Sequence, residues 1–67
     1  MAKKKAPKVL ETWEGITHGK SKFATLEEAQ EFSAMMKAEW GDHDCGWYWT
    51  VGQIDKAGDG CYWVVRP

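Results

Sequence analysis

The sequence predicts a small α+β domain, an antiparallel sheet of three to four strands with one helix packed across one face, in the order β(β)αββ. Two patterns predict this class: a capped amphipathic segment at residues 26–40, and two aromatic, β-branched runs after it. The length agrees, since 67 residues suffice for a single domain. Residues 1–7 are expected to be a disordered basic tail and residues 8–67 the single α+β domain.

The first strand is expected at residues 8–17, where β-branched and aromatic residues alternate imperfectly with polar ones. Residues 18–21 are interpreted as a turn, because Gly19 admits the positive φ that hairpin turns need. Residues 22–24 follow as a short strand. The sheet is therefore expected to begin with a hairpin whose second arm is short.

The helix is the best-defined element of the sequence. Thr25 and Glu28 match a capping box, in which each side chain satisfies the free backbone N–H of the other residue. Gly41 is placed to end the helix in a left-handed conformation. The sequence therefore predicts a helix over residues 26–40, and its buried arc comprises Leu26, Ala29, Phe32, Ser33, Met36 and Trp40.

Two further strands are expected, at residues 46–54 and 61–66. In the loop between them, an aspartate three residues before Gly58 matches a type I turn that leaves this glycine left-handed. Such a loop sets a register with Val51 opposite Trp63, and a slip of one residue would leave tryptophans on both faces. The face directed toward the helix is then formed by Trp47, Trp49, Val51, Trp63 and Val65.

The opposite face of this hairpin is the candidate partner-binding surface. Its residue types, tyrosine and arginine above all, are enriched at the centres of protein interfaces. As an apolar patch it is larger than a small monomer usually exposes, so the first strand or a second copy of the chain is an alternative cover. The residues of this surface are Tyr48, Tyr62, Arg66, Ile54 and Val64.

Charge is distributed unevenly along the chain, whose formal net charge is −1. Six lysines and two glutamates lie within residues 1–22, whereas three basic and eight acidic residues follow. An acidic body repels phosphate backbones, which disfavours a duplex-binding module. The outer side of the helix, with Glu27 and Glu31, is an alternative surface for a basic partner.

No residue pattern predicts a catalytic, metal or cofactor site. His43 and Cys45 lack the spacing of a zinc-ligand pair, and nothing orients a base toward a cysteine nucleophile. In the predicted hairpin, Cys45 lies ~26 Å along the strand from the residue opposite Cys61, too far for a disulfide. A chain this short cannot enclose the usual apolar pocket, so an enzyme is not expected.

The cellular location is predicted from three features that the sequence lacks: a membrane span, a signal segment and a disulfide scaffold. No apolar stretch reaches the length of a membrane span, and no apolar signal segment follows the basic start. Two cysteines are too few for a disulfide scaffold. These features predict a cytoplasmic protein with reduced thiols and no membrane partner.

The expected function is non-enzymatic binding of another protein, as in small inhibitors and adaptors. Phage-encoded inhibitors of host enzymes or defence complexes share this size and type, which is an analogy only. The alternative is a single-stranded nucleic-acid-binding module that stacks bases on Tyr48 and Tyr62 and contacts phosphates through Lys3, Lys4 and Lys5. A structural homodimer is the third possibility.

Overall fold

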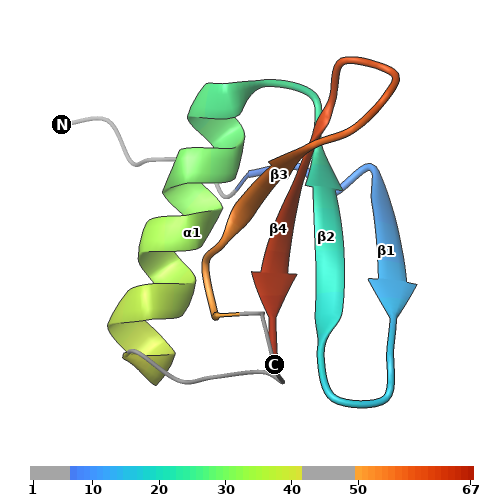
Figure 1. Ribbon diagram of the computed structural model, residues 1–67. Helices are drawn as coiled ribbons and strands as arrows, with labels where there is room; N and C mark the ends of the chain where they lie inside the picture. The colour runs from blue at the N-terminus through green and yellow to red at the C-terminus, as the bar shows by residue number, and fades with distance from the viewer. Residues whose placement is uncertain (1–6, 42–49) are drawn as a thin grey trace, which may run out of the picture.

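The computed structural model describes residues 7–41 and 50–67. It confirms the predicted α+β class and element order. The elements are β1 (Glu11–Glu14), β2 (Gly19–Phe23), α1 (Leu26–Trp40), β3 (Ile54–Lys56) and β4 (Tyr62–Arg66). All strand pairs are antiparallel, the sheet order is β1-β2-β4-β3, and α1 lies along one side of the sheet (Figure 1).

Two groups of predictions lie outside the described residues. The first is the basic tail with its three lysines at positions 3–5. The second comprises the polar cluster after the helix and the aromatic start of the third strand, namely His43, Cys45, Trp47, Tyr48 and Trp49.

The first hairpin turns earlier than predicted. The Gly15 N–H donates to the His18 carbonyl at 2.8 Å, so the turn residues are Ile16 and Thr17. The predicted turn over residues 18–21 is wrong, because these residues belong largely to β2. Alternate residues of β2 are buried, and this burial favours a full strand over the turn that Gly19 alone suggests.

The helix is confirmed at both ends. The Glu28 N–H donates to Thr25 Oγ1 at 3.2 Å, and the Gly41 N–H donates to the Lys37 carbonyl at 2.7 Å. Gly41 has a positive φ, 67°, as predicted, but its ψ of −138° is not that of the left-handed helical conformation. The Glu28 carboxylate accepts from the Thr25 hydroxyl at 3.2 Å, rather than from a backbone N–H as the capping box implies. At the two ends of the predicted buried arc, Leu26 and Trp40 are exposed.

The register of the last hairpin differs from the prediction. Asp55, not Val51, lies opposite Trp63, which is a displacement of four residues. A turn with a left-handed glycine forms as predicted, but two residues later. The Gly60 N–H donates to the Ala57 carbonyl at 3.2 Å, and Gly60 instead of Gly58 has the positive φ, 92°. The Cys61 N–H donates to the Asp59 carboxylate at 3.1 Å, which stabilises the turn in this later position.

The predicted strand over residues 46–54 is wrong at its described end, where a turn and a bulge precede β3. The Gln53 N–H donates to the Thr50 carbonyl at 3.0 Å, and Gly52 has a φ of 88°. The Gly52 N–H donates to the Val65 carbonyl, while the Val65 N–H donates to the Gln53 carbonyl, both at 2.9 Å. Gly52 and Gln53 thus both lie opposite Val65, which is a β-bulge, and regular pairing with β4 starts only at Ile54.

The face under the helix is the opposite of the one predicted. Phe23, Ala29 and Val64 are fully buried there, and the ring centroids of Phe23 and Phe32 lie 4.9 Å apart. Ile54 and Tyr62 pack against the same cluster.

The predicted contact of Trp63 with the helix is therefore wrong. The error in register did not cause this wrong placement of Trp63. A displacement by an even number of residues leaves each side chain of the hairpin on the same face of the sheet. Instead β2, of which the sequence predicts only residues 22 and 23 as strand, pairs Phe23 with Tyr62 and Ser21 with Val64. This pairing determines which side chains of β4 face α1.

Val51 and Val65 form a second buried cluster, against which Met36 packs. The pairing of Val65 with Lys20 places Val65 on the side of the sheet away from the Phe23 cluster, together with Trp63.

Candidate interaction surface on the open face of the sheet

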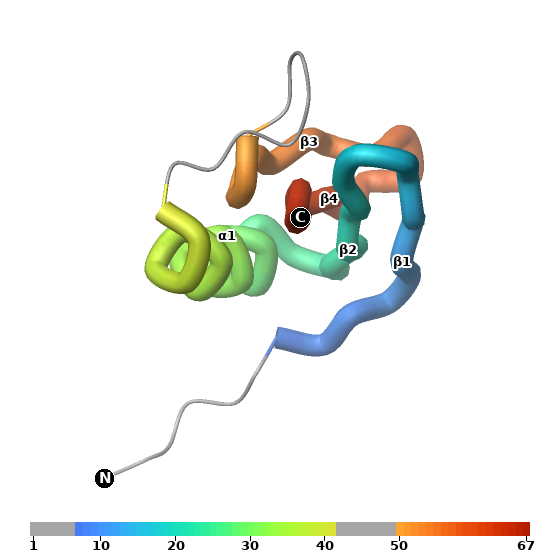
Figure 2. The backbone as a smooth tube through the Cα atoms, turned by 90° about the horizontal axis from the view of Figure 1, so that it is seen from below, coloured from blue at the N-terminus to red at the C-terminus, as the bar shows by residue number. Residues whose placement is uncertain are grey.

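Seen from its end, the sheet has α1 along one side, and β1 lies farthest from the helix (Figure 2). Because Ser21 and Phe23 face the helix, the alternate residues of β2 face away from it. Cross-strand partners share a face, which extends this side across all four strands. We call this side the open face, and its accessible side chains are those of Glu11, Trp13, Lys20, Lys22, Asp55 and Trp63. Val65, which lies opposite Lys20, is on the same side but fully buried.

Lys22 lies at the centre of the open face. Its Nζ is 2.5 Å from Asp59 Oδ2, 3.4 Å from Glu11 Oε1 and 5.5 Å from the centroid of the Trp63 ring. The hydrogen bond with Asp59 raises the pKa of Lys22, although desolvation acts against it, and it lowers the pKa of Asp59. The hairpin loop of residues 57–61 is thus tied to β2 by a charge pair.

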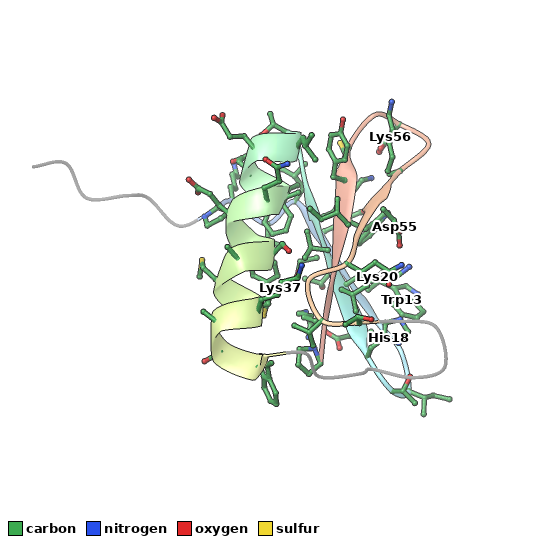
Figure 3. All side chains as sticks on the ribbon, turned by 60° about the vertical axis from the view of Figure 1, so that its left-hand side comes forward. Trp13, His18, Lys20, Lys37, Asp55 and Lys56 are labelled. Carbon is green, nitrogen blue, oxygen red and sulfur yellow. The ribbon has the colours of Figure 1, made fainter. Side chains whose placement is uncertain are left out.

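A second group surrounds Trp13. Lys20 Nζ lies 5.7 Å from the Trp13 ring centroid and 3.8 Å from Asp55 Oδ2. The Trp13 ring also packs against His18, with centroids 5.3 Å apart, and against Gly15, where a Cβ would come within 2.6 Å of the indole. These side chains gather on the side of the sheet away from α1 (Figure 3). The indole is therefore held in place while 47% of Trp13 remains exposed.

The open face presents carboxylates more than ammonium groups. The side chains of Lys22 and Lys20 are only 14% and 19% exposed. Their acidic partners are more accessible, at 64% for Glu11 and 54% for Asp59. A partner approaching this face therefore meets carboxylate oxygens and indole rings.

The predicted partner-binding residues do not form an exposed face. Val64 is fully buried, and Ile54 and Tyr62 pack in the cluster beneath α1. The Arg66 guanidinium donates to Ser21 Oγ at 3.3 Å and pairs with the carboxylate of Glu14. The predicted placement is wrong for these residues. Their role in binding stays a prediction, and their positions lend it no support.

Of the alternative surface on the helix, Glu27 is exposed and Glu31 is partly buried. The acidic helix face stays a prediction.

The sequence interpretation missed the open face, although a signal was present. Residues 19–23 read Gly-Lys-Ser-Lys-Phe, a strict alternation of charged residues with small or apolar ones. This alternation predicts a strand with one buried face and one charged face. Glycine at the first position obscured it, yet Gly19 serves a packing need, since a Cβ there would lie 2.9 Å from the Arg66 guanidinium carbon.

Within residues 7–41 and 50–67, no group of three or more histidine, cysteine or acidic side chains could hold a metal ion. Cys61 is a free thiol in this part of the chain. Desolvation and the nearby Asp59 carboxylate raise the pKa of Cys61, so its reactive thiolate form is disfavoured.

No helix among the described residues is long and apolar enough to cross a membrane. Comparison of the chain with protein families, curated proteins and solved structures finds no match.

Proposed function

We propose that this protein is a non-enzymatic protein-binding module of the small inhibitor or adaptor type, and that the open face is its binding surface. The observation that carries the proposal is the pairing of Lys20 and Lys22 with carboxylates beside Trp13 and Trp63. This arrangement provides aromatic anchors within a fixed pattern of charge.

Two physical features favour a protein partner. Tryptophan is among the residues that most often dominate binding energy at protein interfaces. The ion pairs and cation–π contacts hold the side chains in place before binding, which reduces the conformational entropy lost on association. Trp13 supplies the exposed area, and Trp63 extends the aromatic surface toward β4.

The same observation counts against the nucleic-acid alternative. Proteins that stack single-stranded bases combine the stacking with a positively charged groove that contacts the phosphates. Here Lys22 is held by Asp59 and Glu11, and Lys20 lies beside Asp55. Three carboxylates on one face would repel a phosphate backbone. The stacking residue proposed on β4, Tyr62, packs beneath α1.

The structural homodimer also lacks support from the described residues. It required an apolar patch on the sheet that a second copy would cover, and three residues of that patch, Ile54, Tyr62 and Val64, pack beneath α1 instead.

Affinity capture with matched variants tests the proposal. Trp13→Ala removes the exposed indole, whereas Met35→Ala removes a similarly exposed apolar side chain from α1. Proteins retained from source-cell lysate by the wild type and by Met35→Ala are expected to be lost with Trp13→Ala. In parallel, labelled single-stranded oligonucleotides are expected not to bind. Capture of the same proteins by all three baits, or oligonucleotide binding with a steep salt dependence, would overturn the proposal.

A further inference from the structure

We infer that the edge strand β1 is the docking edge of the open face, and that the partner contributes an extended, basic segment that adds to β1 as a fifth strand. This inference rests on the proposed function and specifies the chemistry of the partner. It is carried by the backbone, charge and exposure of four residues, Glu11–Glu14.

The outer edge of β1 is open to backbone pairing. The hydrogen bond from Gly15 to His18 sets the phase of the hairpin, so Glu11 and Trp13 direct their backbone groups toward β2. Thr12 and Glu14 then direct theirs outward. All four residues of β1 are exposed, and none of the described residues hydrogen-bonds to these outward groups. Figure 1 shows β1 at the outer margin of the sheet.

The other edge of the sheet is protected. β3 has only three residues, Ile54–Lys56, and the bulge at Gly52 and Gln53 interrupts its pairing. Short strands, bulges and lysines are the devices by which natural sheets prevent edge pairing. β1 is one residue longer and contains neither lysine nor proline, so it is the edge better suited to an added strand.

The exposed carboxylates of β1 favour a basic strand as the partner. Glu11 and Glu14 have side chains that are 64% and 70% exposed, although each pairs with a basic residue on the sheet. Two antiparallel copies of β1 in full overlap would place Glu11 opposite Glu14, which disfavours self-pairing. A strand with lysine or arginine at alternate positions would instead place cations beside Glu11 and over the exposed Trp13 ring.

Hydrogen exchange with synthetic peptides tests the inference. The probes are a short peptide that alternates lysine and valine, its counterpart with glutamate for lysine, and the lysine peptide methylated at alternate backbone nitrogens. The lysine peptide is expected to slow exchange of the Thr12 and Glu14 amides by about tenfold or more, because both would become hydrogen-bonded. The other two peptides are expected to leave these rates unchanged.

Matched variants separate charge from backbone pairing. Glu11→Gln is expected to reduce the protection given by the lysine peptide, whereas Glu27→Gln on α1 is expected to leave it unchanged. Equal protection by the glutamate peptide, no protection at β1, or protection confined to α1 would overturn the inference.

The outcome is distinguishable from that of the proposed function. If Trp13→Ala abolishes protein capture while the lysine peptide leaves β1 unprotected, the open face binds proteins but β1 does not accept a basic strand. If Trp13→Ala leaves capture unchanged, the proposed function fails whatever the peptides do.

Discussion

The Ser33 hydroxyl donates a buried hydrogen bond of 2.6 Å to the carbonyl of Gly52, which ties the middle of α1 to the turn before β3. The turn has little room at this point. A Cβ on Gly52 would lie 2.7 Å from Lys37 Cε and 2.9 Å from Ser33 Oγ. The helix can therefore approach the turn closely here, because Gly52 has no side chain and Ser33 has only a short hydroxyl group.

Ser33→Ala is expected to destabilise the domain by about 1–3 kcal/mol, because the Gly52 carbonyl would lose its partner inside the protein. Urea denaturation measures this difference. Gln30→Ala, at an exposed position of the same helix, is the control and should change stability by less than about 0.5 kcal/mol. Equal stability of the two variants would show that the hydrogen bond contributes nothing.

Alanine substitutions at two glycines with similar positive φ distinguish the cost of backbone strain from the cost of crowding. Gly52 and Gly60 have φ of 88° and 92°, but nothing lies within 4 Å of a Cβ at Gly60. Gly60→Ala should therefore cost only the left-handed strain of about 1–2 kcal/mol. Gly52→Ala should cost clearly more, because Lys37 and Ser33 must move. Similar losses of stability for both variants would contradict the close approach of α1.

The Lys22–Asp59 pair predicts a pH dependence of stability. The pKa of Asp59 is lowered from 3.8 in the folded state, so its contribution is present above that value and is lost as pH falls through the folded pKa. The pKa of Lys22 is raised from 10.5, so its contribution is present below that value and is lost as pH rises through the folded pKa. Asp59→Asn removes the charge pair.

Urea midpoints measured for wild type and Asp59→Asn across pH test this expectation. Their difference should be constant near neutrality and shrink at both extremes. Parallel curves from acid to alkaline pH would show that the pair does not form in solution.

The assignment of the two sheet faces predicts that removing a buried and an exposed aromatic side chain will affect stability very differently. Phe23→Ala is expected to cost about 3–5 kcal/mol, enough to unfold a domain of this size. Trp13→Ala, on the open face, is expected to leave a cooperative unfolding transition near that of the wild type. A Trp13→Ala protein that melts far below wild type would show that the indole belongs to the core.

The helix could be predicted because its signals are local. Thr25, Glu28 and Gly41 lie within or beside the helix, and the helix begins and ends where these residues predict. Only the contact of the Glu28 carboxylate, with the Thr25 hydroxyl instead of a backbone N–H, differs from the capping box. A turn with a left-handed glycine between the last two strands could also be predicted, since only a few consecutive residues determine it.

The position of that turn and the choice of buried face depend on distant residues. Gly58 and Gly60 both suit the left-handed position, and Lys22, far away in the sequence, reaches Asp59 in the turn that forms. Tyr62 faces the helix because β2 pairs with β4, a pairing that no local pattern specifies. The candidate binding residues were misplaced for this reason.

The most direct test of the proposed binding surface compares two charge reversals of equal size. Asp55→Lys changes the open face, and Glu27→Lys changes the outer side of α1, so both alter the net charge identically. Affinity for the captured partner is measured by calorimetry, once both variants are shown to fold. We predict that Asp55→Lys weakens binding by about tenfold or more, equivalent to about 1.4 kcal/mol, and that Glu27→Lys leaves it unchanged. Loss of binding with Glu27→Lys alone would contradict the account and assign recognition to the helix.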